Sequence, residues 1–295
     1  MVSWRIGCHQ YNELFVSQGD YTDPSEHHID FKQWSVQKLG DEPIQHTRTF
    51  TFQPRWELSY PLKSILAVFA HPDDETFRPG GTLALLARRG VRVQVLTATR
   101  GGAGSCGKPP LCTTEELPSV REQELRCACA ALGIDPPIIL DYKDGCLAET
   151  NPDTIVAEIM SVVDDLRPQI ILTFGSDGLS GHPDHIAIGQ FTSEAYHHAT
   201  SVKALYTLAI PESISEKLAM LQIRAVPDKA ITLTVDISAV WEEKMKAIQC
   251  HLTQLSSSPI TRAPLERQRL FLGTEFFVLA GKRSGRDILA ELESN

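Results

Sequence analysis

SILAVFAHPDDE, residues 64–75, joins an apolar run directly to a cluster of polar side chains. The run SILAVFA carries no charge and is bounded by polar residues, which is typical of a strand buried on both faces. His71, Asp73 and Asp74 follow that strand within four positions. Because neighbouring carboxylates repel each other, their charge has to be offset by a cation, a helix N-terminus or solvent.

Apolar runs alternate with stretches of helical length from residue 62 onward. Strands are expected at 64–70, 91–101, 137–145, 169–178, 204–210, 230–237 and 275–281. Helices are expected around 80–90, 119–134, 151–168, 182–200, 211–222 and 238–255. This alternation predicts the α/β class, with a mostly parallel sheet and helices on both faces.

Residues 1–60 differ from the domain expected at 61–295. They hold nearly half of the chain's aromatic residues, and prolines interrupt any regular period. A disordered tail usually contains fewer aromatic residues. We therefore expect an irregular, aromatic-rich extension that packs on the domain or on a neighbouring subunit, with an edge strand at HTRTFTFQP. A homo-oligomer is consistent with such an extension.

Charge and composition narrow the class of protein. The net charge of −9 argues against a general nucleic-acid binder, which would normally be basic. No stretch approaches the ~20 apolar residues of a membrane span, and the N-terminus lacks the apolar core of a secretory signal. A cytoplasmic location is the expectation.

The seven cysteines include no CxxC pair, so most are expected to be reduced thiols. Cys106 and Cys112 flank GKPPL in a loop and could pair under oxidation.

Polar clusters follow three of the expected strands: HPDDE after the first, KDG after the third and GSDGLSGHPDH after the fourth. In parallel sheets, ligands bind outside the carboxyl ends of the strands, so these clusters should converge. Two histidines and a carboxylate suit zinc, and also iron(II) or another divalent metal. The remaining carboxylate and histidine could then act as base and acid. The alternative is that both HPD motifs are only helix caps.

The motifs resemble those of the LmbE/PIG-L-type N-deacetylases. AHPDDE after an apolar strand and the later GHPDH carry the likeness, and VREQELRCACAALGI, LDYKDGCL and KMKAIQCHLTQ extend it over roughly residues 62–282. The resemblance implies a Rossmann-like fold and a zinc-dependent hydrolase. Such an enzyme removes an acetyl group from an N-acetylglucosamine-type sugar or sugar conjugate, with a zinc-bound water attacking the amide.

The resemblance also implies roles for individual residues. The metal ligands fall on His71, Asp74 and His185, and the general base falls on Asp73. The histidine that stabilises the oxyanion or acts as acid falls on His182, with Asp184 as its orienting carboxylate. Arg121 and Asp144 fall where the family contacts substrate hydroxyls; the alternatives are a helix-surface arginine and a turn aspartate.

Several positions depart from the family or stay open. The family's T-R-G-E-x-G loop reads TRGGAG here, without its glutamate, and the insert 105–119 could act as a lid. His251 is expected either at the rim of the site or packed at a helix end, and Glu242-Glu243-Lys244 is expected on a solvated helix face. The alternatives to a sugar deacetylase are a hydrolase of a non-sugar amide on the same site and a catalytically weak sugar-binding or interaction module.

Overall fold

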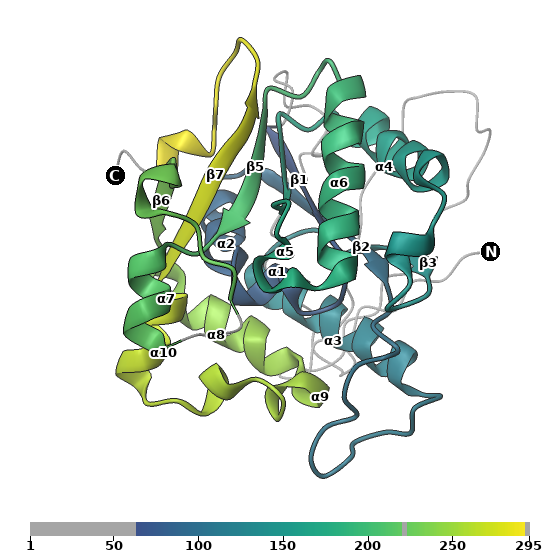
Figure 1. Cartoon of the computed structure of the whole chain (residues 1–295), viewed down its shortest axis with the longest axis vertical. Coiled ribbons are helices and arrows are strands. Elements are labelled where there is room, and N and C mark those ends of the chain that lie inside the picture. Colours follow the sequence, from purple (N-terminus) through teal and green to yellow (C-terminus); the bar gives the residue numbers. More distant parts are fainter. Residues whose placement is uncertain (1–62, 220–222, 293–295) are drawn as a thin grey trace, which may run out of the picture. The chain divides into compact units, whose positions relative to one another are not determined.

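A seven-stranded sheet forms the centre of the part of the chain that the structure describes. The structure is a computed structural model and describes residues 63–219 and 223–292. The strands lie in the order β3-β2-β1-β4-β5-β7-β6 (Figure 1). The expected N-terminal extension and its edge strand lie outside the described residues.

Five strands form a parallel block, as the sequence predicts. β1 (Ser64–Phe69) pairs in parallel with β2 (Arg92–Thr99) on one side and with β4 (Ile170–Phe174) on the other. β3 (Ile138–Tyr142) and β5 (Ala204–Ala209) continue the block outward. The strand order therefore reverses between β1 and β4, which is where α/β sheets of this kind open a crevice for ligands.

The other edge of the sheet is antiparallel. β7 (Thr274–Lys282) pairs in the antiparallel sense with β5 and also with β6 (Leu233–Asp236). The sheet is thus mostly parallel, and the prediction of an α/β fold with a mostly parallel sheet is confirmed.

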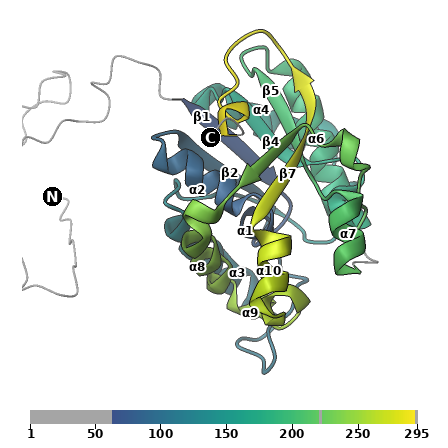
Figure 2. The ribbon, with the colours of Figure 1, turned by 90° about the vertical axis from the view of Figure 1, so that its left-hand side faces the viewer.

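Helices cover both faces of this sheet (Figure 2). α2 (Gly80–Arg88), α3 (Leu117–Leu132) and α8 (Trp241–Cys250) lie on one face. α4 (Pro152–Leu166) and α6 (Pro183–His198) lie on the other. The Asn151 side chain accepts a hydrogen bond from the Asp153 amide at 3.0 Å, so it caps α4 as its sequence predicts.

The helix expected at 238–255 is broken at one residue. α8 ends at Cys250, and the short α9 (Leu252–Leu255) begins after His251, which is fully buried. A further helix, α10 (Leu265–Leu272), had no counterpart in the sequence analysis. Two one-turn helices, α1 (Asp74–Phe77) and α5 (Gly178–Gly181), were not expected either. The helix α7 (Glu212–Leu218) was expected.

Lys244 does not lie on a solvated face, so that expectation was wrong. The side chain is fully buried, and its Nζ donates to Glu275 Oε1 at 2.7 Å and to the Leu272 carbonyl at 2.9 Å. Glu275 in turn accepts from the Gly81 and Thr82 amides, at 2.8 Å each. This buried pair therefore caps α2 while fastening it to α8 and β7.

One disulfide occurs among the described cysteines, between Cys127 on α3 and Cys250 at the end of α8. Cys106 and Cys112 are free thiols, as are Cys129 and Cys146. The bond that forms is thus not the pair considered from the sequence. In the described ranges, none of the helices combines the length and apolar character that crossing a bilayer requires.

Candidate metal centre and active site

The polar clusters do converge at the carboxyl ends of the strands. His71 to Asp74 follow β1, and His182 to His185 lie at the start of α6, after β4. Asp144 reaches the same place from the loop after β3, where its Oδ1 lies 3.0 Å from His71 Nε2. The candidate site thus occupies the reversal point of the sheet between β1 and β4.

Three of these side chains present ligand atoms at metal-site spacing. His71 Nδ1 lies 3.2 Å from His185 Nε2. Asp74 completes the set, with Oδ1 3.3 Å from His185 Nε2 and Oδ2 3.8 Å from His71 Nδ1. Tetrahedral zinc ligands at about 2.0–2.1 Å from the metal lie about 3.3 Å from one another. The donor set His71, Asp74 and His185 therefore fits a small divalent metal.

Both imidazoles are held so that the nitrogen facing this set is free to bind a cation. His185 Nδ1 lies 3.1 Å from the Gly178 carbonyl, which can only accept, so Nδ1 carries the proton. The ring also stacks on Phe174 at 4.0 Å between centroids. His71 directs Nε2 at two carboxylates, Asp144 and Asp184, and keeps Nδ1 toward Asp74 and His185. Hydrogen bonds of this kind orient metal-ligating histidines.

Asp184 orients a different histidine from the one expected. Its carboxylate lies 3.2 Å from His71 Nε2 and accepts from the Gly145 and Leu147 amides, at 2.7 and 3.1 Å. The residue is completely buried. The carboxylate therefore fixes His71 and the loop after β3, whereas His182 meets Asp184 only through the backbone amide.

His182 is both a helix cap and part of the cluster. Its Nδ1 accepts from the Asp184 amide at 3.2 Å, which caps α6. Because Nδ1 accepts, the neutral ring carries its proton on Nε2 and can donate it. Ring nitrogens of His182, His71 and His185 lie within 4.8 Å of one another, so His182 borders the metal-ligand set.

Asp73 and Arg121 form a partly buried ion pair beside the ligands. Arg121 Nη2 lies 3.2 Å from Asp73 Oδ2, and it also donates to the Pro72 carbonyl. Arg121 is only 3% exposed, so it is not the helix-surface arginine that was the alternative. Its Nη1 donates to the Gly101 carbonyl at 2.9 Å. The guanidinium thus ties the HPDD turn to the loop after β2.

Asp144 also braces that loop. Its Oδ2 accepts from the Ala103 amide at 2.8 Å while its Oδ1 faces His71. Gly101 in the same loop has φ +67°, and a Cβ there would lie 2.2 Å from Arg121 Nη1. Glycine is therefore required at this position by both its backbone angle and its neighbour.

The charges of the site favour a cation. Burial alone would lower the pKa of His71, but hydrogen bonds to Asp144 and Asp184 raise it to about 10. Burial likewise lowers the pKa of His185, but the Asp74 carboxylate outweighs it, so the pKa is raised overall. Without a metal, protons on these rings offset the carboxylates, and a bound metal would replace them. The charge of the adjacent aspartates is thus offset by the histidine rings and by Arg121, and a bound metal would take over the part of the ring protons.

Glu75 had no assigned role from the sequence, and for His251 a place at the rim and packing at a helix end were both open. Glu75 follows the adjacent aspartates and accepts from the Asp73 amide through Oε2 at 2.9 Å. Its Oε1 lies 2.7 Å from His251 Nε2, and both side chains are completely buried. His251 is therefore packed inside the domain behind Asp73, and not at the rim. The apolar spacing of the helix expected at 238–255 gave no sign of this contact.

Comparison with known proteins adds to this geometry. The model of the family PIG-L, GlcNAc-PI de-N-acetylase, matches residues 66–196, which contain all the candidate site residues from His71 to His185. A curated relative from Acidothermus cellulolyticus, 1D-myo-inositol 2-acetamido-2-deoxy-alpha-D-glucopyranoside deacetylase, is 30% identical over 259 residues. That alignment covers 74% of this chain and 89% of the relative.

Solved structures share the fold. N,N'-diacetylchitobiose deacetylase from Pyrococcus horikoshii superposes with a TM-score of 0.53 at 20% identity, over 76% of this chain and 87% of that one. The 4-carboxy-2-hydroxymuconate hydratase GalB from Pseudomonas putida gives 0.56 at 22% identity, over 77% and 100%. A hydratase on this fold means that the fold alone does not decide the reaction. The family match and the relative's identity over most of its length show that the chain belongs to the PIG-L family of de-N-acetylases.

Proposed function

We propose that this protein is a metal-dependent N-deacetylase that removes the acetyl group from an N-acetylglucosamine-type sugar or sugar conjugate. The observation that carries the proposal is the set His71, Asp74 and His185, with Asp73 and His182 next to it. The two ring nitrogens lie 3.2 Å apart, one Asp74 oxygen lies 3.3 Å from the His185 nitrogen, and the other lies 3.8 Å from the His71 nitrogen. The deacetylase relative supports the choice of an acetamido sugar as substrate.

The donor set fits zinc, with iron(II) as the alternative metal. When bound, such a metal lowers the pKa of water and polarises a carbonyl. His71, Asp74 and His185 would hold it, and Asp144 and Asp184 would keep the His71 ring oriented through its Nε2 proton.

The chain's own residues would carry the protons. Asp73, next to the ligand Asp74, would take a proton from the attacking water as the general base. His182, whose Nδ1 is engaged as a helix cap, would donate from Nε2 to the developing charge on the amide oxygen. Water adds to the acetamide carbon, the C–N bond breaks, the amine takes a proton, and acetate leaves. Arg121 reaches Asp73 and not open solvent, so we assign it to holding the base.

The first test combines metal analysis with acetate release. We expect about one zinc or iron per chain and acetate release from N-acetylglucosamine glycosides, lost on chelation. An N-acetyl amino acid serves as the matched non-sugar amide. Asp73→Ala should lose turnover and keep its metal, whereas His185→Ala should lose the metal.

The outcomes separate the hypotheses. Turnover of the N-acetyl amino acid alone would favour a non-sugar amidase, and sugar binding without acetate release would favour a binding module. Equal metal loss in Asp73→Ala and His185→Ala would contradict the division of roles. Metal loss in His182→Ala would make His182 a ligand.

A further inference from the structure

Asp73 has a backbone conformation that a non-glycine residue rarely adopts. Its φ is 105° and its ψ is −26°. Such a conformation is strained and persists only where neighbouring groups impose it. The backbone angles of Asp73 set the direction in which its carboxylate points. The position of the proposed base therefore depends on this strained conformation, directly before the proposed ligand Asp74.

Hydrogen bonds fix the peptide groups on both sides of Asp73. The Asp73 carbonyl accepts from the Thr76 amide at 3.0 Å and from Thr76 Oγ1 at 2.8 Å. These bonds are local, within the first turn of α1. The Asp73 amide donates to Glu75 Oε2 at 2.9 Å. The rest of the domain acts on this turn through two side chains: Glu75, which accepts from the Asp73 amide, and Arg121, which donates to the Pro72 carbonyl and pairs with the Asp73 carboxylate.

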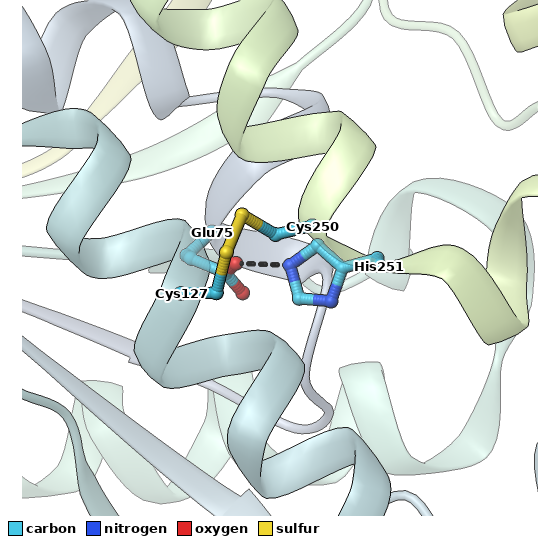
Figure 3. Close-up of a disulfide and its surroundings, with 4 residues drawn as sticks. All are labelled: Glu75, Cys127, Cys250 and His251. Carbon is cyan, nitrogen blue, oxygen red and sulfur yellow. Dashed lines mark hydrogen bonds and ion pairs between the residues drawn. A yellow bond between two sulfur atoms is a disulfide. The ribbon is translucent and has the colours of Figure 1, made fainter. Parts of the chain in front are cut away.

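The Glu75 carboxylate is itself anchored from far away in the sequence. Its Oε1 accepts from His251 Nε2 at 2.7 Å, across 176 positions. Both side chains are 0% exposed, and Figure 3 shows them facing each other between α1 and the junction of α8 with α9. A buried carboxylate needs a paired, hydrogen-bonded partner, so the ion pair sets where Glu75 can lie.

We propose that Glu75 and His251 are positioning residues, which hold the left-handed backbone of Asp73 so that its carboxylate faces the metal-ligand set. Both side chains are completely buried, so we expect them to act through Asp73 and not on a substrate directly. The expected effect on kcat rests on the proposed function. The anchoring of the Asp73 amide does not, because it is a property of the protein without substrate.

The junction that carries His251 is fastened to α3 at two further points. Glu124 accepts from the Thr253 amide at 2.8 Å and from Thr253 Oγ1 at 2.7 Å. The Cys127–Cys250 disulfide joins α3 to the residue that precedes His251, and it lies next to the Glu75–His251 contact (Figure 3). Glu124 thus holds the same junction without contacting Asp73, which makes it a matched control.

Three variants test the proposal in the metal-loaded protein. Glu75→Met keeps the volume and removes the acceptor, and we expect kcat to fall by about 10–100-fold with KM and metal content unchanged. Glu75→Gln keeps an oxygen for the Asp73 amide and should stay within about threefold of the wild type. Glu124→Ala should lower thermal stability but keep kcat within the same range. A second readout, hydrogen exchange of the Asp73 amide, should be fast only in Glu75→Met.

The results can overturn the proposal. Wild-type kcat and amide protection in Glu75→Met would do so, and so would an equal loss of kcat in Glu124→Ala. If Glu75→Met does not fold, the double variant Glu75→Gln/His251→Leu removes the anchor without leaving a buried charge, and the same loss is expected. Should the wild type release no acetate, the proposed function fails, while amide exchange still decides whether Glu75 holds Asp73.

Discussion

At the scale of single residues, burial and a neighbouring cation act in opposite directions on the pKa of the Asp73 carboxyl. Burial raises the pKa of its carboxyl to about 6, and the Arg121 guanidinium, 3.2 Å away, opposes that rise. A general base works when it is deprotonated, so Arg121 extends the range of pH in which Asp73 can accept a proton. The pair therefore tunes the base as well as orienting it.

Replacing Arg121 by Met should raise the pKa of Asp73 above 6, because the opposing cation is lost and the burial stays. The direct measurement is a titration of the Asp73 carboxyl carbon by NMR in metal-free protein. In the loaded enzyme, the acid limb of kcat/KM should move to higher pH. Arg126→Met is the control, since Arg126 lies on the same helix but pairs with Glu122 at the surface. An unchanged Asp73 titration in Arg121→Met would contradict the assigned role.

Sequence reasoning brought the site residues together but not all of their contacts. Residue type and position after buried strands grouped the histidines and aspartates of the two HPD motifs, and the family resemblance singled out His71, Asp74 and His185 among them as metal ligands. The histidine that Asp184 contacts could not be predicted from the sequence. Both His182 and His71 are within reach of its carboxylate, and only the packing of the loop after β3 decides between them. The burial of Lys244 was hidden for the same reason, since Glu275 comes from a distant strand.

At the scale of elements, the fold was readable where each element carries its own signal. The central strands β1 and β4 are almost entirely apolar, and α4 carries Asn-Pro at its start. The break at His251 was not readable, because the side chain leaves the helix to meet Glu75 in α1. The antiparallel pairing of β7 with β5 and β6 likewise depends on contacts between distant segments.

The disulfide between α3 and α8 is the covalent link between these elements, and it should stabilise the domain. Closing a loop of 123 positions restricts the unfolded chain, which is worth about 2–4 kcal/mol. Urea unfolding with and without reductant measures its contribution.

The expected result is a lower urea midpoint in reductant for the wild type and no effect of reductant on Cys127→Ser. Cys112→Ser is the matched control, because Cys112 is a free thiol and its loss should leave the effect of reductant intact. A wild-type midpoint that does not depend on reductant would show that the bond adds no stability or does not form in the purified protein.

At the scale of the whole domain, the proposed metal ligands come from both sides of the point where the strand order reverses. His71 and Asp74 follow β1, and His185 lies on α6, beyond β4. A metal held by all three would bind the native state and not the unfolded chain. Zinc at 100 times its dissociation constant should then add about 2.7 kcal/mol to the free energy of unfolding.

For a domain of this size, that gain corresponds to a rise in Tm of roughly 5–10 °C. Thermal unfolding of metal-free protein, with and without added zinc, measures the shift without any substrate. His185→Ala should show almost none of it, because one ring nitrogen of the ligand set is gone while the β1 side remains. Asp73→Ala should keep it, since the base is not a ligand. An equal shift in His185→Ala would place the bound zinc elsewhere on the protein and remove the support for a metal at the reversal point of the sheet.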